Sequence, residues 1–374
     1  MTVATAPKTR VCVLVNALHA RSGGGVTYLR NVLPLLAKDE RLELHLFIED
    51  DQIEIFHPTD EKVRVHAVTS TGGPAMLAIW EQAVLPILAR VMGASIIFSP
   101  ANFGCLLSGR NVVLLRNALS VLRVEPRPGR WLYWGTISLM TLLSVLRSVK
   151  IMAVSDYAAR TLTFGLQRLL KEKISVIHHG VSRFFTPAID ARRERFILVV
   201  ADIYVQKNLL NFFRAAAIIC RRAPDIRIKV VGAPIDPWYS DQVRSLVASL
   251  GIGERVEFMG RQPMEEVLAL YRKCLFLAFP STAETFGNPL VEAMACGTPI
   301  ACSNTSAMPE IVGEAALYFD PLDPVAIAEA CLQMIESDNL RASLAAKGLD
   351  RSRKFSWEEC GRRVADVLVE AGAG

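Results

Sequence analysis

The stretch FPSTAETFGNPLVEAMACGTPIACSN, residues 279–304, contains the turn that decides the fold. It begins inside an apolar run, LFLAFPS, that is typical of a buried strand, and NPLVEAMACG then has the pattern of a helix. Asn288 is expected to cap this helix, Pro289 to be its first residue, and Gly297 to end it. The run TPIACSN that follows is a second buried strand. This order of elements predicts a βαβ unit of a parallel sheet.

The same alternation extends in both directions from this unit. Near the N-terminus, the strand RVCVLVNAL is followed by a glycine-rich turn and a helix, and a later helix, AMLAIWEQAVLPILARVM, is interrupted by Pro86. The pattern lapses into polar residues at FTPAIDARRER, residues 185–195, and restarts with FILVVAD. Continuous apolar strands must be covered by helices on both faces. We therefore predict an α/β protein with two tandem Rossmann-like, doubly wound domains.

The polar stretch sets the predicted domain boundaries. Residues 1–185 form the first domain, residues 186–355 the second, and residues 356–374 a closing helix. Ser356 and Glu359 have the spacing of a capping box at the start of that helix. Ligands of doubly wound sheets bind beyond the carboxyl ends of the strands, so the two domains are expected to face each other across a cleft.

Length and composition limit the class of protein. A chain of 374 residues is too long for one ordinary core, and 51% hydrophobic with 21% charged residues is typical of a folded globular protein. The net charge of +5 suits anionic ligands or an acidic membrane surface. No run of Lys and Arg with interleaved aromatic residues occurs, so we expect no nucleic-acid partner.

Eight cysteines lie mostly in apolar runs, and no two have CxxC spacing. This arrangement favours reduced thiols in a core over disulfides or a metal site, and we expect no metal. The first ten residues, MTVATAPKTR, lack the hydrophobic core of a secretory signal, which predicts a cytoplasmic protein.

One apolar segment has two interpretations. WLYWGTISLMTLLSVL, residues 131–146, lies between Arg130 and Arg147 and is too short to span a membrane. A buried helix of an α/β domain is the favoured interpretation. The alternative is peripheral membrane contact through residues 131–147, because aromatic residues at one end of an apolar helix resemble an interfacial belt, on the inner face of the membrane.

The turn within residues 279–304 contains the chemistry of the candidate site. Glu284 follows the strand, where a ligand is expected, and Gly287 allows the backbone to approach that ligand closely. The N-terminus of the next helix offers free N–H groups to an anion such as phosphate. Glu292, one turn inside the helix, can accept two hydrogen bonds from adjacent ribose hydroxyls.

The segment STAETFGNPLVEAMACGTPIACSNTSAMPEIVGEAALYFDPLDP resembles the nucleotide-sugar segment of the retaining GT-B glycosyltransferases, specifically glycosyltransferase family 4, also called group 1. That family has two glutamates in a context like PS-x-x-E-x-FG-x-P-x-x-EAMACGTPV. VVADIYVQKN, WEQAVLP and GGGVTYLRNVL are similar to other parts of the family. The resemblance covers nearly the whole chain.

The resemblance implies a GT-B fold and a reaction. A nucleoside diphosphate sugar binds the second domain, a glycan or lipid-linked acceptor binds the first, and the sugar keeps its anomeric configuration. No metal or other cofactor is implied, so Lys207 and the helix N-terminus at Phe286, Gly287 and Asn288 would hold the diphosphate. Glu292 would bind the ribose, and Glu284 would act at the donor sugar as a nucleophile, a stabiliser or a binding group.

Other candidate residues lie in the glycine-rich turn of the first domain and after later strands. Gly24 and Gly25 are expected to face the donor phosphates from a loop. Asp202 adds a negative charge near the diphosphate, and Arg261 could compensate for it. Relatives often have His-Asp or His-Glu where this chain has Arg116 and Asn117, so these two residues and His19 are the candidates on the acceptor side.

These departures leave a second hypothesis open. The chain could be a nucleotide-sugar-binding protein of the same fold with lost or altered transfer activity. A third possibility, an NAD-dependent oxidoreductase, is disfavoured because neither domain opens with a G-x-G-x-x-G pattern. The favoured interpretation is a hexosyltransferase of cell-surface polysaccharide or lipopolysaccharide assembly.

Overall fold

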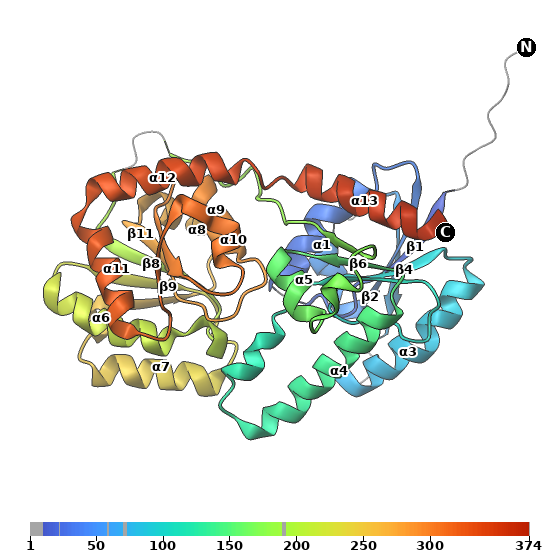
Figure 1. Ribbon diagram of the computed structural model, residues 1–374, viewed down its shortest axis with the longest axis horizontal. Coiled ribbons are helices and arrows are strands. Elements are labelled where there is room, and N and C mark those ends of the chain that lie inside the picture. Colours follow the sequence, from blue (N-terminus) through green and yellow to red (C-terminus); the bar gives the residue numbers. More distant parts are fainter. Residues whose placement is uncertain (1–9, 22, 58–59, 70–72, 189–191, 374) are drawn as a thin grey trace, which may run out of the picture. The chain divides into compact units, whose positions relative to one another are not determined.

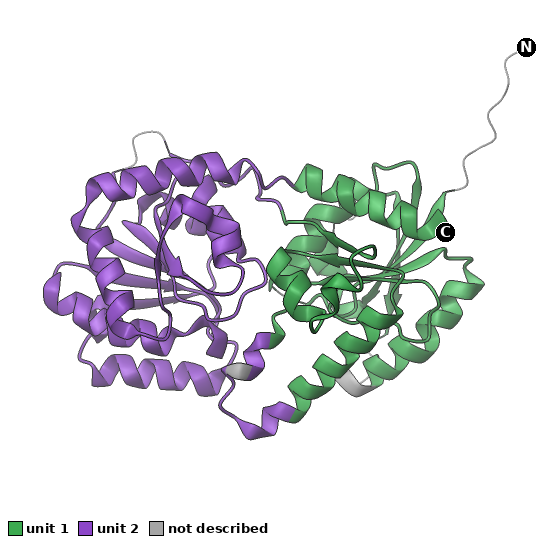
Figure 2. Cartoon of the chain, viewed as in Figure 1, with its two compact units in different colours: residues 1–119, 132–179, 357–374 green, residues 120–131, 180–356 purple. Residues whose placement is uncertain are grey.

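A computed structural model describes residues 10–373, apart from 22, 58–59, 70–72 and 189–191. The chain divides into two compact units (Figure 2). Unit 1 consists of residues 1–119, 132–179 and 357–374, and unit 2 of residues 120–131 and 180–356. The main division therefore falls at 179/180, ahead of the polar stretch that we chose from the sequence, and a short segment before residue 132 belongs to unit 2.

Unit 1 is built on a seven-stranded parallel sheet (Figure 1). Its strand order is β3-β2-β1-β4-β5-β6-β7, and β1 pairs with β2 from Val11↔Leu42 onward. The strands are β1 (Val11–Asn16), β2 (Leu42–Glu49), β3 (Val63–Val68), β4 (Ile96–Ser99), β5 (Asn111–Leu115), β6 (Lys150–Ala153) and β7 (Ile174–Val176).

The helices of unit 1 are α1 (Gly23–Leu36), α2 (Ile53–Phe56), α3 (Pro74–Val91), α4 (Trp131–Arg147), α5 (Asp156–Leu162) and α13 (Trp357–Ala373). The first residue of α4, Trp131, is assigned to unit 2 and the rest of that helix to unit 1. The last of these, α13, packs against α1 and β1. Its first residue, Trp357, stacks on His179 with ring centroids 5.5 Å apart. The chain leaves unit 1 after His179 and returns to it at Trp357, so the points of exit and return are in contact.

Unit 2 has a six-stranded parallel sheet in the order β10-β9-β8-β11-β12-β13. The strands are β8 (Phe196–Val200), β9 (Arg227–Val231), β10 (Val256–Gly260), β11 (Phe276–Phe279), β12 (Ile300–Ser303) and β13 (Ala316–Phe319). The helices are α6 (Leu209–Arg222), α7 (Pro237–Ser249), α8 (Met264–Lys273), α9 (Asn288–Ala295), α10 (Met308–Val312), α11 (Pro324–Glu336) and α12 (Asp338–Ser352). The predicted pair of doubly wound α/β domains is confirmed.

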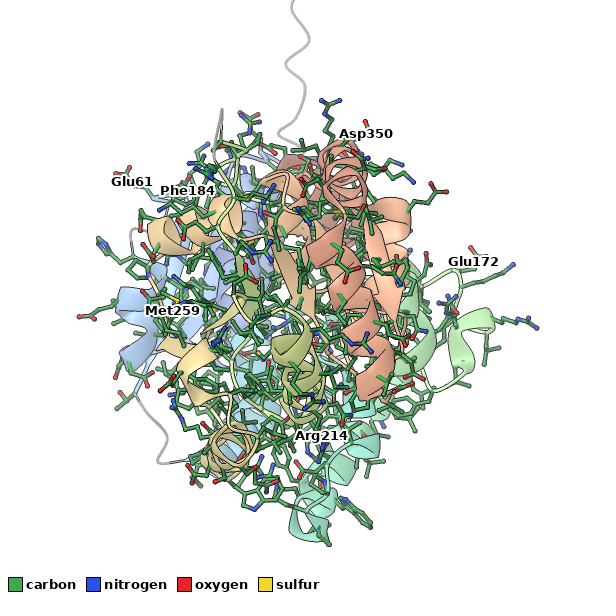
Figure 3. All side chains as sticks on the ribbon, turned by 90° about the vertical axis from the view of Figure 1, so that its left-hand side faces the viewer. Glu61, Glu172, Phe184, Arg214, Met259 and Asp350 are labelled. Atoms are coloured by element: carbon green, nitrogen blue, oxygen red, sulfur yellow. The ribbon has the colours of Figure 1, made fainter. Side chains whose placement is uncertain are left out.

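Each unit has an apolar core and a charged exterior. The central strand residues, such as Leu14 in unit 1 and Leu198 in unit 2, have no exposed surface. Exposed charged side chains such as Glu172 and Asp350 extend outward (Figure 3). All eight cysteines are free, as predicted, and six are buried.

Each sheet has one point where the strand order reverses. In unit 1 it lies between β1 and β4, and in unit 2 between β8 and β11. The loops that leave these neighbouring strands run in opposite directions, and doubly wound sheets bind ligands at the carboxyl edge beside such a point. Of the candidate residues, His19 follows β1, Lys207 follows β8 and Glu284 follows β11.

Three local predictions were wrong. Gly24 and Gly25 lie in the first turn of α1 instead of a loop. Pro86 lies inside α3, which continues to Val91, because packing of the helix outweighs one lost backbone hydrogen bond. The cap of α9 is Gly287, in the left-handed region with φ +89°, so the helix begins one residue earlier than predicted, at Asn288. Gly297 ends α9 with φ +66°, as predicted.

The favoured interpretation of residues 131–146 as a buried helix was also wrong. The helix α4 forms, but its buried residues are Thr141, Ser144 and Val145. Most of the large apolar side chains of its first half are exposed, including Leu132 at 81%. The apolar pattern identified a helix without showing which of its faces is covered.

Candidate functional site

The centre of the candidate site in unit 2 is an ion pair at the point where the strand order reverses. Lys207 ends a short 3₁₀ turn, Val205–Lys207, after β8, and Glu284 lies in the loop after β11. The Lys207 Nζ donates to Glu284 Oε1 at 2.6 Å. Both side chains are largely buried, so this pair is much less screened by water than a surface pair.

The surroundings keep Lys207 charged. Burial alone would lower its pKa, but the attraction of Glu284 and Tyr204 outweighs burial, and the pKa of Lys207 lies above its usual value. The Nζ also lies 5.5 Å from the ring centroid of Tyr204 and 5.6 Å from that of Phe279. The lysine therefore presents a permanent cation at this edge of the sheet.

Hydrogen bonds hold the loops around the pair in place. Asn208, in the left-handed region with φ +57°, donates from Nδ2 to the carbonyls of Pro280 at 3.1 Å and Pro321 at 2.7 Å. The Thr282 N–H donates to the carbonyl of Gln206 at 2.9 Å. These contacts join the loops after β8, β11 and β13, so the positions of Lys207 and Glu284 are fixed before any ligand binds.

Asp202 does not face a diphosphate site as an unpaired charge. Its Oδ1 accepts a hydrogen bond from the Ala233 N–H at 2.8 Å, which joins the turn after β8 to the turn after β9. The two backbones are in close contact there, because an added Cβ on Gly232 would lie 2.1 Å from the carbonyl oxygen of Ala201. Asp202 therefore has a structural role in these turns.

The N-terminus of α9 follows Glu284 directly. Phe286 and Gly287 are buried, and Asn288 begins the helix. The left-handed backbone of Gly287 leads into the helix, and this cap residue makes no side-chain hydrogen bond to the first turn, unlike a serine or aspartate cap. This arrangement supplies N–H groups and a positive helix end for an anion.

Glu292 lies one turn inside α9 and is partly buried. Its Oε2 accepts a hydrogen bond from the Tyr271 Oη at 2.9 Å. Burial raises the pKa of Glu292 to about 7, although the hydrogen bond from Tyr271 lowers it. The carboxylate is therefore costly to ionise in the free protein, and a ligand with two hydroxyls could supply the hydrogen bonds that it lacks.

Arg261 is not brought to this pair. It follows β10, the edge strand, and one strand, β9, separates β10 from β8, the strand that leads into the Lys207 turn. Its side chain is exposed, and within the described part of the chain it forms no ion pair. Since Asp202 is bonded to Ala233, the compensating role that we expected for Arg261 is not needed.

His19, a candidate residue of unit 1, also lies at a reversal of strand order. His19 follows β1, and its ring contacts that of Phe103 after β4, with centroids 5.1 Å apart. His19 Nε2 lies 2.9 Å from Glu81 Oε2, and the Asn16 Nδ2 donates to Glu81 Oε1 at 2.5 Å. Glu81 comes from α3 and is 1% exposed.

Arg116 and Asn117, after β5, are held by their backbones. The Asn102 Oδ1 accepts from both N–H groups at 2.8 Å. The Arg116 side chain donates from Nε to the carbonyl of Pro100 at 2.7 Å, and burial lowers its pKa to about 10. Its guanidinium fills the space next to Gly25, where an added Cβ would lie 2.3 Å from Nη2. Gly25 is therefore needed for the packing of Arg116.

Sequence reasoning missed Tyr271, Asn102 and Glu81 as parts of these sites. A usable signal exists only for Glu81. It lies on the buried stripe of α3 that also contains Leu77, Leu85 and Ala89, four residues apart along the helix. A carboxylate in an apolar stripe must have hydrogen-bond partners, which marks it as part of a polar cluster.

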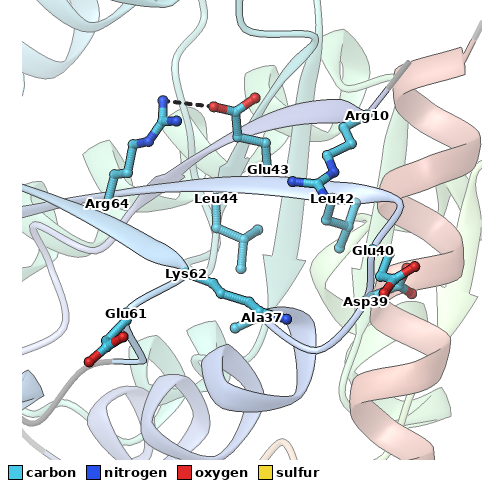
Figure 4. A pocket seen from close by; sticks show the side chains of 10 residues that line it. All are labelled: Arg10, Ala37, Asp39, Glu40, Leu42, Glu43, Leu44, Glu61, Lys62 and Arg64. Carbon is cyan, nitrogen blue, oxygen red and sulfur yellow. Dashed lines mark ion pairs between the residues drawn. The ribbon is translucent and has the colours of Figure 1, made fainter. Parts of the chain in front are cut away.

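A pocket of about 340 Å³ in unit 1 lies at the other edge of the sheet (Figure 4). It is lined by residues at the amino ends of β1, β2 and β3, among them Arg10, Glu43 and Arg64, and Arg64 pairs with Glu43 at 2.8 Å. Ligands of doubly wound sheets bind at the carboxyl edge. This pocket is therefore separate from both candidate sites.

Comparison with known proteins identifies the second unit. Residues 185–351 match the family model "Glycosyl transferases group 1". This segment is a group 1 glycosyltransferase domain. The domain contains every candidate residue of unit 2, from Lys207 to Glu292. The O-antigen chain mannosyltransferase B of Escherichia coli is 27% identical over 220 residues, which are 56% of this chain and 58% of that protein. The match covers 58%, 51% and 60% of the length of three curated relatives and 35% of the length of a fourth.

Solved structures match nearly the whole of this chain, beyond its glycosyltransferase domain. Anabaena Alr3699/HepE in complex with UDP and glucose has a TM-score of 0.77 and 18% identity, over 96% of this chain and 100% of that one. WaaG, a glycosyltransferase involved in lipopolysaccharide biosynthesis, has a TM-score of 0.71 and 14% identity, over 96% and 99%. At these identities the likeness concerns the fold. The two-domain α/β GT-B fold that we predicted is confirmed.

Proposed function

We propose that this protein transfers a sugar from a nucleoside diphosphate sugar to a hydroxyl of a glycan or lipid-linked acceptor. The observation that carries the proposal is the buried Lys207–Glu284 pair beside the N-terminus of α9, at the reversal of strand order in unit 2. The group 1 glycosyltransferase domain supports it, and so do the structural neighbours that were solved with UDP, glucose or UDP-glucose.

The donor would bind through three features of unit 2. The Lys207 ammonium and the N–H groups at the start of α9 would hold the two phosphates and stabilise the negative charge that develops on the leaving diphosphate. The Glu292 carboxylate would accept hydrogen bonds from the two ribose hydroxyls. Glu284, paired with Lys207, would lie next to the donor sugar, where its charge would favour a cationic transition state at the sugar carbon.

We propose that the sugar keeps its anomeric configuration and that the reaction needs no metal ion. Both parts rest on the resemblance to glycosyltransferase family 4. A permanent cation at Lys207 and a positive helix end are a chemically sufficient substitute for a metal on the diphosphate. A chelator experiment tests this part directly, because a metal-dependent enzyme would lose its activity.

The acceptor would bind unit 1, on the side of His19, Arg116 and Asn117. Because two of the matched proteins act in O-antigen chain and lipopolysaccharide synthesis by name, we propose an acceptor from cell-surface polysaccharide or lipopolysaccharide assembly. Such acceptors contain many hydroxyls and often an anionic group. Arg116 would bind that anionic group.

We propose that α4 contacts an anionic membrane surface. Its exposed residues include Trp131, Leu132 and Tyr133, and the helix contains no acidic residue. Arg130 and Arg147 lie at its two ends and are exposed. An apolar face with aromatic residues and cations is typical of an interfacial helix. No helix among the described residues is long and apolar enough to cross a bilayer.

The first test is a donor panel. Purified protein is mixed with UDP, GDP and dTDP sugars, with and without a chelator, and both melting temperature and sugar release are measured. One nucleotide sugar should raise the melting temperature, and slow release of its sugar should continue in the chelator. Binding without any transfer would favour the alternative of a nucleotide-sugar-binding protein, and no shift with any donor would refute the proposal.

A further inference from the structure

The cluster formed by Asn16, His19 and Glu81 in unit 1 carries an inference beyond the donor site. Glu81 is 1% exposed, and among the described residues no lysine or arginine pairs with it. Its two oxygens are instead shared between the Asn16 amide and the His19 ring, at 2.5 and 2.9 Å. A buried carboxylate is costly unless its partners are donors, so both partners must present N–H groups to it.

This requirement fixes the tautomer of His19. The Nε2 must carry a proton in order to donate to Glu81 Oε2, which leaves the lone pair of the neutral ring on Nδ1. Among the described residues, Nδ1 has no hydrogen-bond partner, and the side chain is 27% exposed. His19 therefore offers one acceptor atom toward solvent at the carboxyl edge of the sheet.

The loop that bears His19 is held from two further directions. Gln52, after β2, donates from Nε2 to the carbonyls of Ala17 and Ala20, both at 3.0 Å. Arg21 is bonded to Glu49 and Asp51. The residues on both sides of His19 are therefore held by side chains from other elements, an arrangement that is typical of a preorganised side chain.

The neighbouring residue of α3, Gln82, organises the loop after β4. Gln82 donates to the carbonyl of Gly104 at 3.1 Å and accepts from the Leu106 N–H at 2.7 Å. In the sequence WEQ, Glu81 thus fixes the loop after β1 and Gln82 the loop after β4. These are the two loops that flank the reversal of strand order in unit 1.

We infer that Glu81 is a positioning residue, which holds His19 as the Nε2–H tautomer so that Nδ1 accepts a hydrogen bond from the acceptor hydroxyl. The arrangement is that of a carboxylate orienting an imidazole toward a hydroxyl. This inference rests on the proposed function, since it assigns the attacking hydroxyl of the glycosyl transfer to unit 1. It adds to that function the positioning role of Glu81, the Nδ1 atom of His19 as the acceptor of the hydrogen bond, and the Nε2–H tautomer of that ring.

The tautomer can be measured without any substrate. In the full-length ¹⁵N-labelled protein, long-range ¹H–¹⁵N spectra distinguish a protonated ring nitrogen from one with a lone pair. The His19 signals are assigned by their loss in His19→Gln. We expect protonated Nε2 and unprotonated Nδ1 in the neutral ring. A protonated Nδ1 in the wild-type protein would overturn the inference, whether or not any variant folds.

Variants then separate positioning from folding. Glu81→Met keeps the volume and removes both acceptor oxygens, and we expect a mixture of His19 tautomers. Glu54→Met, at an exposed glutamate of unit 1, is the matched control and should leave the His19 signals unchanged. If Glu81→Met folds with an unchanged His19 tautomer, Glu81 has no positioning role.

The acceptor role is tested with octyl β-D-glucoside as the hydroxyl probe and UDP present. Addition of the glucoside should move the Nδ1 signal in the direction of an accepted hydrogen bond. In steady-state assays, Glu81→Met and His19→Leu should lower kcat/KM for the probe about tenfold or more, with the donor KM unchanged, and His19→Gln should retain more activity than His19→Leu. An unmoved Nδ1 signal, or an equal loss of donor affinity, would overturn the inference.

Failure of the proposed function has a different signature. If no nucleotide sugar shifts the melting temperature of the wild-type protein, the donor site in unit 2 is wrong, whatever the His19 spectra show. If the donor binds and is hydrolysed, but the Nδ1 signal does not move when the glucoside is added, the donor site is supported and the role assigned to His19 is wrong.

Discussion

Through the raised pKa of Glu292, we expect the affinity for the proposed donor to depend on pH. Burial raises this pKa to about 7, and only the ionised carboxylate offers both of its oxygens as strong acceptors to the ribose hydroxyls. At pH 6 about one tenth of the carboxyl groups are ionised, and at pH 8 about nine tenths. Because apparent affinity scales with the competent fraction, the Kd for the donor at pH 6 should be about tenfold weaker than its limit at high pH.

The free energy of unfolding and the donor affinity change in opposite directions as the pH rises. Because the folded pKa of Glu292 is raised above its usual 4.5, its contribution to the free energy of unfolding is fully present below 4.5 and is lost as pH rises through about 7. The free protein thus loses stability over the pH range in which donor affinity increases. Donor binding should therefore raise the melting temperature more at pH 8 than at pH 6.

Isothermal titration calorimetry between pH 5.5 and 8.5 measures this effect. The ligand is the nucleotide sugar that the donor panel selects, because its diphosphate has no ionisation near pH 7, whereas the terminal phosphate of a free nucleotide has one near 6. Glu292→Gln should bind weakly at every pH. Tyr271→Phe removes a hydrogen bond that lowers the pKa of Glu292, so the midpoint should move to higher pH.

Two results would refute this reasoning. If the wild-type Kd is constant from pH 6 to pH 8, the carboxylate of Glu292 does not bind the donor. If Tyr271→Phe moves the midpoint to lower pH, the cause that we assign to the shifted pKa is wrong.

Three further predictions concern other parts of the molecule. Lys207→Ala and Glu284→Gln should each lower kcat by a factor of about 100 or more in a donor-hydrolysis assay, and a normal rate would remove the role of that residue. Gly232→Ala should lower the free energy of unfolding by about 2 kcal/mol in urea titrations, because its Cβ would overlap the Ala201 carbonyl. Leu132→Asp should release the protein from anionic vesicles in sedimentation, and equal sedimentation of both forms would end the membrane proposal.

The βαβ order was readable from the sequence because buried parallel strands are continuous apolar runs. The pairing of Lys207 with Glu284 depends instead on which strands are neighbours. These residues are 77 positions apart in the chain, and they meet because β8 and β11 lie side by side. The sequence gives strand order only through rules of connection, so the resemblance to a family was needed to select both residues.

Side-chain partners were the least predictable part. Arg193 lies in the polar stretch that we interpreted as a linker, yet its guanidinium donates to the carbonyls of Cys274 at 2.9 Å and Gly297 at 2.6 Å. Arg127 lies among residues assigned to the first domain, yet it binds Asp236, the cap of α7 in unit 2, with its shorter contact at 2.5 Å. Composition shows that such residues are polar, but an arginine can satisfy distant carbonyls or carboxylates as readily as solvent.

Glu81 shows where a sequence can still indicate a buried polar cluster. A helix stripe of Leu77, Glu81, Leu85 and Ala89 predicts a buried face, and one charged member in it contradicts simple core packing. Such local conflicts persist where the charge has partners that the fold supplies, here Asn16 at the end of β1 and His19 in the loop after it. The conflict marks the site, whereas the identity of the partners requires the structure. For the same reason, replacing Glu81 with leucine should restore the apolar stripe and still disorder the loop of His19, so hydrogen exchange at Ala17 and Ala20 would increase while α3 remains protected.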